Sequence, residues 1–153
     1  MSSNFGMRKH PVLGYSKMHQ GIDFASPNGT PILAAGNGIV AFAGVKGGYG
    51  NYVEIKHNKE YSTAYAHTSR YAKGLKIGKK ITQGEIIAFV GSTGRSTGPH
   101  LHFEIIHLGK KINPSSVKSL SGIKLNGKEL TKFQNRKAEI DNYRKTMPNQ
   151  FYN

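Results

Sequence analysis

Short apolar runs alternate with glycine-rich turns from Thr30 to Asn113, and this tempo constrains the fold more than any other feature of the chain. The runs read PILAA, IVAFAG, NYVEIKH, EYSTAYAHT and IIAFVGST. Each has the length of a strand rather than of a helix, and β-branched and aromatic residues are frequent in them. We therefore expect an all-β domain, a sandwich or a barrel, built mainly from antiparallel strands.

The run HLHFEII, residues 100–106, has the two-residue alternation of a strand with one apolar face. One face of this strand would carry Leu101, Phe103 and Ile105. The opposite face would carry His100, His102 and Glu104. Two imidazoles on one face, about 7 Å apart by strand geometry, form half of a metal site or of an acid–base pair. They need a partner from elsewhere in the chain.

The segment HQGIDF supplies a histidine and a carboxylate, His19 and Asp23, four positions apart. A helix would place both on one face, but Gly21 and the nearby Pro27 argue against a helix. We expect an extended or turning backbone there. A further histidine, His67, lies near the end of the predicted strand EYSTAYAHT. Taken singly, each of these residues is more typical of a structural role than of a site.

The composition limits the chemistry that is available. The 153 residues fit one domain and include no cysteine, which excludes disulfide scaffolds, thiolate zinc sites and cysteine nucleophiles. Lysine and arginine outnumber aspartate and glutamate by 22 to 8, for a formal charge of +14. This charge attracts polyanions such as nucleic acid, anionic lipid or an acidic cell wall, or it serves solubility alone. No ordered aromatic platform accompanies it, so we expect no nucleic-acid partner.

The chain is predicted to have three parts. Residues 1–18 read as an irregular leading segment, residues 19–120 as the β domain, and residues 121–153 as a basic linker followed by a helix. Apolar residues of the last part recur at helical spacing, at Leu130, Phe133, Ile140 and Tyr143. We expect this C-terminal helix to be amphipathic and to pack back on the β domain.

The sequence carries no export address. No apolar run reaches the ~18 residues of a membrane span, and no signal-peptide core follows the N-terminus. The chain is therefore expected to be either cytoplasmic or the excised domain of a longer exported protein. Membrane contact is expected only through segments outside this sequence.

Five polar residues lie at predicted strand ends or glycine loops, namely His19, Asp23, His67, His100 and His102. Two histidines and one carboxylate suit a catalytic zinc that keeps its fourth position open. Zinc lowers the pKa of a bound water to ~7 and so provides a nucleophile at neutral pH. The two remaining histidines could serve as general base and as stabiliser of the developing oxyanion. Spacing alone leaves open which member of the His-x-His pair binds metal.

Four segments, MHQGIDFASPNGTPI, GYGNYVEIKH, AYAHTSRY and GSTGRSTGPHLHFEI, resemble those of lysostaphin/LytM-type zinc metallopeptidases that cut peptidoglycan. The resemblance covers roughly residues 5–115, and the opening FGMRKHPVLGYSKMH and the basic tail are most similar to Gram-negative murein cross-link endopeptidases. It implies an antiparallel β fold, a sandwich/barrel-like hybrid with a central substrate groove whose floor carries the metal. It also implies that His19, Asp23 and His102 hold zinc, while His67 and His100 are the catalytic histidines that do not bind it.

The same resemblance implies a periplasmic or otherwise extracytoplasmic endopeptidase whose partners are the cross-link peptides of peptidoglycan. In a Gram-negative wall the bond runs from D-alanine to the side-chain amine of meso-diaminopimelate. We expect a monomer whose basic surface helps it to dock on the wall. Some family members use an upstream tyrosine to stabilise the oxyanion; Tyr15 lies near that place but out of register. Glu104, on the same strand face, is expected to form a surface ion pair, with orientation of a ligand histidine from behind as the alternative.

Three other functions fit parts of the pattern. A catalytically inactive relative could bind the wall and activate another enzyme, but it should have lost one of the five site residues. A phosphocarrier of the glucose-specific IIA kind has a related β architecture and paired histidines, and its main task needs no zinc. A cupin would place its glutamate three or four residues after the His-x-His, whereas Glu104 follows after one. The remaining histidines, His10, His57 and His107, are interpreted as surface or structural residues.

Overall fold

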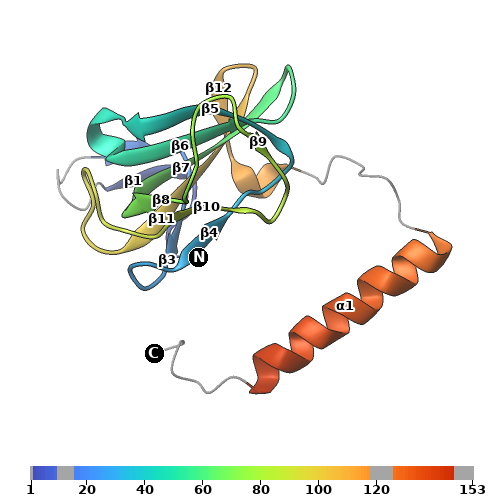
Figure 1. Cartoon of the computed structure of the whole chain (residues 1–153). Coiled ribbons are helices and arrows are strands. Elements are labelled where there is room, and N and C mark those ends of the chain that lie inside the picture. The colour runs from blue at the N-terminus through green and yellow to red at the C-terminus, as the bar shows by residue number, and fades with distance from the viewer. Residues whose placement is uncertain (1, 10–15, 118–125, 147–153) are drawn as a thin grey trace. The chain divides into compact units, whose positions relative to one another are not determined.

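The computed structural model describes residues 2–9, 16–117 and 126–146 (Figure 1). Two compact units are present, Met1–Val117 and Lys118–Asn153. The strands of the first unit are β1 (Gly6–Lys9), β2 (Ser16–His19), β3 (Ile22–Ala25), β4 (Pro31–Leu33), β5 (Gly38–Val45), β6 (Asn51–Lys56), β7 (Tyr61–Thr68), β8 (Arg70–Tyr71), β9 (Lys80–Ile81), β10 (Ile86–Phe89), β11 (His100–His107) and β12 (Lys110–Ile112). Two short 3₁₀ turns are η1 (Gly47–Tyr49) and η2 (Pro114–Ser116).

The described strands form three antiparallel sheets. The largest has the order β12-β11-β7-β6-β5-β9, with β3 also paired to β11. A second sheet has the order β4-β10-β8, and β1 pairs with β2. None of these sheets closes into a barrel. The prediction of an all-β antiparallel fold is therefore confirmed, as an arrangement of open sheets.

Strand β11 organises the largest sheet. It pairs with β7 along one edge, while β3 and β12 pair with successive halves of the other edge. As its alternation predicts, Leu101 and Phe103 pack against the main apolar core. On the opposite face His102 and Glu104 are buried. The core itself consists of side chains from several strands, including Ile32, Val40, Val53, Ile55, Tyr65 and Ile87.

The leading segment is more regular than its sequence predicts. Strands β1 and β2 form an antiparallel ladder in which Gly6 is the partner of His19, so the expectation of an irregular segment is wrong for these residues. The runs GMRK and SKMH are short and not alternating, and their hydrogen bonds come from each other rather than from a local repeat. A sequence period cannot detect such a pair. Two residues named above, His10 and Tyr15, lie outside the described residues.

A two-residue turn within the segment HLGKK joins β11 to β12. Leu108 and Gly109 both have left-handed backbones, with φ of 47° and 77°. This is the geometry of a tight hairpin turn whose twist matches that of the strands. The resulting register pairs Ile106 with Lys111. Because side chains alternate, Lys111 lies on the same face as Glu104.

The second unit contains helix α1 (Gly127–Thr146), which confirms the predicted C-terminal helix. An ion pair between Arg136 and Glu139 links successive turns on its surface. Packing of this helix on the β domain stays a prediction. Among the described helices, none combines the length and apolarity needed to cross a membrane.

Candidate metal centre

Backbone pairing brings three polar side chains together at one end of the large sheet. Asp23 and His102 are direct partners in the β3–β11 ladder, and His19 is the last residue of β2. The backbone between His19 and Asp23 is extended and turning rather than helical, as expected. It passes so close to β11 that a Cβ at Gly21 would lie 2.5 Å from the Phe103 carbonyl oxygen and 2.7 Å from His102 Cε1. Only glycine fits there, which is how the chain turns tightly over His102.

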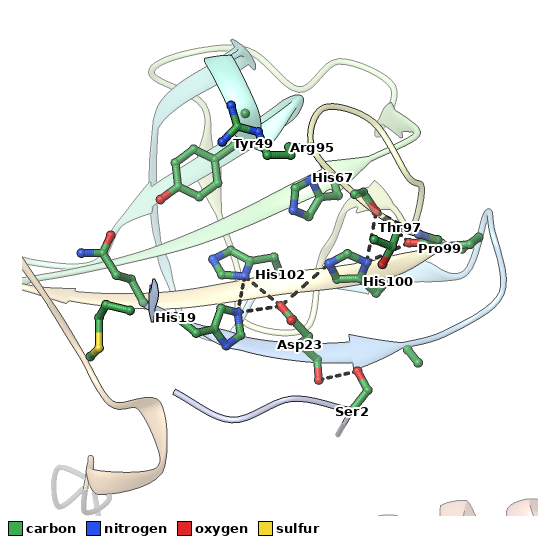
Figure 2. A pocket seen from close by; sticks show the side chains of 16 residues that line it. Ser2, His19, Asp23, Tyr49, His67, Arg95, Thr97, Pro99, His100 and His102 are labelled. Atoms are coloured by element: carbon green, nitrogen blue, oxygen red, sulfur yellow. Dashed lines mark hydrogen bonds and ion pairs between the residues drawn. The ribbon is translucent and has the colours of Figure 1, made fainter. Parts of the chain in front are cut away.

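The three ligand-type atoms form a small triangle (Figure 2). His19 Nε2 lies 3.1 Å from Asp23 Oδ1 and 3.1 Å from His102 Nδ1. His102 Nδ1 lies 2.8 Å from Asp23 Oδ1. Zinc bonds of about 2.0–2.1 Å in a tetrahedron separate neighbouring ligand atoms by about 3.3 Å. The triangle is close to that size, and all three residues are buried.

Hydrogen bonds to the far nitrogen of each ring fix which nitrogen faces the triangle. His19 Nδ1 donates to the Asn4 carbonyl oxygen at 2.7 Å, and His102 Nε2 donates to Glu104 Oε1 at 3.0 Å. The nitrogens that remain, Nε2 of His19 and Nδ1 of His102, therefore present lone pairs. Two imidazole lone pairs and a carboxylate oxygen converge on one point. This donor set fits a divalent transition metal such as zinc.

The electrostatics also favour a cation at this point. Burial disfavours the charge on Asp23, but hydrogen bonds to His102 and His19 outweigh burial and hold the pKa of this carboxyl far below its usual range. Burial would lower the pKa of His102, yet hydrogen bonds to the Asp23 and Glu104 carboxylates raise it instead. Two carboxylates within reach of one ring therefore attract positive charge.

Glu104 lies behind His102 and is fully buried. The expectation of a surface ion pair is therefore wrong. Its Oε1 accepts hydrogen bonds from His102 Nε2 and from the Tyr49 hydroxyl, each at 3.0 Å, and lies 3.0 Å from Lys111 Nζ. Burial would raise the pKa of Glu104, but the hydrogen bonds from His102 and Lys111 lower it below its usual value. The carboxylate thus stays charged behind the ring that it contacts.

Lys111 and Tyr49, which support Glu104, were not predicted from the sequence. Lys111 Nζ donates to the Tyr49 hydroxyl and, at 3.1 Å, to Gln20 Oε1. Burial would lower the pKa of Lys111, but hydrogen bonds to Tyr49 and Glu104 raise it. The hairpin signal in HLGKK could have identified Lys111, because a two-residue turn puts it on the face of Glu104. Tyr49 comes from η1 and has no periodic signal.

His67 and His100 lie beside the triangle, with ring centroids 4.8 Å apart (Figure 2). Both rings are hydrogen-bonded to the loop 91–99 through Nδ1. His67 Nδ1 donates to the Thr93 carbonyl oxygen and His100 Nδ1 to the Gly98 carbonyl oxygen, each at 2.8 Å. Their Nε2 atoms remain for other chemistry, and His100 Nε2 lies 3.8 Å from Asp23 Oδ1. Burial lowers the pKa of His67, which keeps this imidazole neutral.

His67 adopts a left-handed backbone, with φ of 60°, at the end of β7. A non-glycine residue in this region is uncommon and is often found at functional sites. This conformation was not predicted from the sequence. It accompanies the placement of the His67 ring next to those of His100 and His102, at centroid distances of 4.8 and 5.9 Å.

All five residues singled out in the sequence line one cavity of about 540 Å³. Its walls come from β2, β3, β7, β11, the turn at Tyr49 and the loop 91–99. The strands supply the rigid floor, and the loop supplies a wall rich in serine, threonine and glycine. This is the arrangement expected for a groove with polar groups on its floor.

Two further histidines have structural environments. His57 uses both ring nitrogens, with Nδ1 2.7 Å from the Asn37 carbonyl oxygen and Nε2 2.7 Å from Thr63 Oγ1. His107 stacks on Tyr61 at a centroid distance of 4.4 Å. Neither lines the cavity that contains His19. Both agree with their interpretation as structural or surface residues.

Comparison with known proteins adds independent information. The model of peptidase family M23 matches residues 17–114. The DD-carboxypeptidase/endopeptidase Mpg of Neisseria meningitidis is 50% identical over 117 residues, which are 76% of this chain and 26% of that protein. This chain spans about a quarter to a third of the length of the curated relatives that it matches.

Two solved structures are similar in fold and sequence. A zinc-containing peptidase from Vibrio cholerae has a TM-score of 0.67 and 41% identity, over 73% of this chain and 34% of that one. The catalytic domain of the antimicrobial peptidase lysostaphin from Staphylococcus simulans has a TM-score of 0.67 and 32% identity, over 74% of this chain and 87% of that one. The first unit of this chain thus shares its fold with catalytic domains.

Proposed function

The chain belongs to peptidase family M23, and on that premise we propose that it is a zinc endopeptidase that hydrolyses peptide cross-links of bacterial peptidoglycan. The observation that carries the proposal is the buried triangle of His19, Asp23 and His102, whose ligand-type atoms lie 2.8–3.1 Å apart. Relatives named as peptidoglycan DD-endopeptidases support the substrate class. The cut bond is then the one from D-alanine to the side-chain amine of meso-diaminopimelate.

The proposed ligands are His19 through Nε2, His102 through Nδ1 and Asp23 through a carboxylate oxygen. Zinc held there would act as a Lewis acid that polarises the scissile carbonyl and lowers the pKa of a bound water. Hydrogen bonds orient the two rings before a metal binds. The Asn4 carbonyl oxygen accepts from His19 Nδ1 and the Glu104 carboxylate accepts from His102 Nε2, so the other nitrogen of each ring faces the metal site. Such outer partners orient the rings and raise their basicity.

His67 and His100 are proposed to move the protons. One of them takes a proton from the attacking water through the lone pair of its Nε2. The other, as an imidazolium protonated on both nitrogens, donates a hydrogen bond from Nε2 to the oxygen that becomes negative. The proton taken up is then delivered to the nitrogen of the leaving amine, so that acid and base are restored. The carbonyls of Thr93 and Gly98 keep each Nδ1 protonated, which leaves each Nε2 for substrate.

Glu104 is proposed to position His102 rather than to touch substrate. Its carboxylate holds the Nε2–H of the ring, and Lys111 and Tyr49 hold the carboxylate in turn. Tyr15, proposed for the oxyanion, stays a prediction. We also propose an extracytoplasmic site of action, since the substrate lies there. Membership of the M23 family removes the phosphocarrier alternative.

The test is a digest of purified cross-linked muropeptides with zinc-loaded protein, analysed by mass spectrometry. Wild-type protein should convert dimers to monomers, and the masses of the products identify the bond. His102→Ala serves as the inactive comparison, with its zinc content measured in parallel. Intact dimers from wild-type protein that holds zinc would instead favour another peptide bridge or a wall-binding role without catalysis.

A further inference from the structure

The loop wall of the cavity carries one strongly basic side chain. Arg95 is exposed and lines the same cavity as His67, His100 and His102 (Figure 2). Among the described residues that line this cavity, no other has a guanidinium or ammonium group. None of the ion pairs found in the part of the chain that the structure describes includes Arg95. Its charge is therefore available to a ligand in the cavity.

The backbone that carries Arg95 is held firmly. Its N–H donates to the Gly48 carbonyl oxygen at 2.8 Å. The neighbouring Gly94 has a φ of 72°, and a Cβ there would lie only 2.3 Å from the Gly50 nitrogen. The two loops thus approach more closely than any side chain would allow. Arg95 therefore extends from a rigid support, which reduces the entropy lost when its guanidinium binds.

The charges of the cavity are separated. Its acidic side chain among the described residues is Asp23, which is engaged with His19 and His102. Arg95 comes from the loop 91–99, whereas those three residues come from strands of the floor. A bound molecule with one anionic group therefore has a preferred orientation, with the anion at the guanidinium. Arginine binds carboxylates through two parallel hydrogen bonds, which adds geometric selectivity.

We propose that Arg95 forms a carboxylate subsite on the leaving-group side of the scissile bond, an inference that rests on the proposed function. In the D-alanyl–diaminopimelate link the carbon next to the scissile nitrogen bears a free carboxylate, whereas the carbon next to the scissile carbonyl bears a methyl group. The guanidinium binds that carboxylate and so sets the direction in which the cross-link lies over the metal site. Cross-links whose acceptor amine has no adjacent carboxylate are bound more weakly.

The experiment measures binding separately from catalysis. The probe is a cross-linked peptide in which a ketomethylene group replaces the scissile amide, prepared with the adjacent carboxyl either free or amidated. Zinc-loaded wild-type protein should bind the free acid about 10–100-fold more tightly than the amide, the range expected for a hydrogen-bonded charged pair. Arg95→Gln should bind both probes equally, at the level of the amide, while Arg95→Lys keeps part of the preference.

A third probe is the matched control: it is amidated only at a carboxyl of the same peptide that lies far from the scissile bond. Each protein, wild type or variant, should bind this probe with the same affinity as it binds the free acid. Zinc content and Tm of Arg95→Gln should equal those of wild type, because the side chain is exposed. A wild type that binds acid and amide equally, or an Arg95→Gln that keeps the preference, overturns the subsite. A preference that depends on Arg95 without any cleavage of the natural dimer supports the subsite and contradicts the proposed reaction.

Discussion

The cavity that contains His19 and His102 differs from a second cavity, lined by His57, Asn37 and Lys80 among others, in how the protein uses the two nitrogens of each histidine ring. His57 gives both nitrogens to protein partners, a carbonyl and a hydroxyl. In the first cavity the far nitrogen of His19 is tied to Asn4 and that of His102 to Glu104, while the near nitrogens meet at Asp23. An imidazole with one ring nitrogen held by such a structural partner can still bind a metal or move a proton through the other nitrogen. An imidazole with both nitrogens held in this way can only support the fold.

The largest effect on zinc binding and activity is expected from removing a ring nitrogen that faces Asp23, namely His19 Nε2 or His102 Nδ1. His19→Ala or His102→Ala deletes one of three proposed ligands, so zinc should no longer bind stoichiometrically. Loss of several kcal/mol of charge stabilisation corresponds to a fall in kcat/KM of about a thousand-fold or more. Metal analysis and muropeptide turnover measure both quantities. A variant that keeps full activity without the ring would remove it from the metal site.

Changes at His67 or His100 should separate catalysis from metal binding. His67→Ala and His100→Ala are expected to keep zinc but to lose about 10²–10⁴ in kcat, the range for a positioned acid or base. Because burial lowers the pKa of His67 from its usual value of about 6.5, the ring stays neutral down to lower pH. Activity that depends on neutral His67 should therefore fall only below about pH 6.5. Zinc loss in either variant would assign that residue to the metal instead.

Glu104 tests the partner behind the ring. Glu104→Gln keeps the size of the side chain. Its amide can donate a hydrogen bond to His102 Nε2, which favours the tautomer with the proton on Nδ1, the nitrogen proposed to bind zinc. Zinc affinity should fall about 10–100-fold, which a competitive chelator titration measures. Activity at saturating zinc should recover in large part, because Glu104 does not touch substrate in this proposal. Unchanged zinc affinity would mean that Glu104 serves the fold alone.

Lys111 tests the charge that supports Glu104. Lys111→Met removes the ammonium group that lies beside the buried Glu104 carboxylate. The free energy of unfolding of the metal-free protein should fall by about 2 kcal/mol at pH 7. This value is smaller than for a fully buried pair because Lys111 is partly exposed. The folded pKa of Glu104 is lowered, so its contribution is complete above the usual pKa of about 4.3 and is lost as the pH falls through the lower folded value. The difference between Lys111→Met and wild type should therefore shrink in acid, as denaturant unfolding at several pH values would reveal.

The smallest effect is expected in the second cavity. His57→Gln should retain zinc and activity, and it should lower the free energy of unfolding by about 1 kcal/mol through the hydrogen bonds to Asn37 and Thr63. Denaturant unfolding and a zinc assay measure the two outcomes. Loss of zinc from this variant would contradict the assignment of a purely structural role to His57, whose two ring nitrogens are both hydrogen-bonded to structural partners.

The sequence by itself determined the strands and the chemistry that they carry. Alternation in residues 100–106 separated Leu101 and Phe103 from His102 and Glu104, because successive side chains of a strand must point to opposite faces. The HLGKK turn determined the β11–β12 hairpin, because a two-residue connection between antiparallel strands adopts few conformations. The absence of cysteine restricted any metal site to histidines and carboxylates.

Only the tertiary structure decided which of these residues meet. His100 and His102 lie on the same strand face, so spacing cannot separate their roles. The β3–β11 register does, since it sets Asp23 opposite His102 and Ala25 opposite His100. Register depends on hydrogen bonds between residues nearly eighty positions apart, and no local period encodes such a pairing.

The same reason explains the features that the sequence concealed. The β1–β2 pair, the burial of Glu104 and the hydrogen bond from Tyr49 all depend on segments that approach one another only after the chain has folded. Local alternation reports which face a side chain occupies, but not what covers that face. Packing of distant segments made Glu104 a buried partner of His102, and long-range backbone pairing made His19, Asp23 and His102 one site.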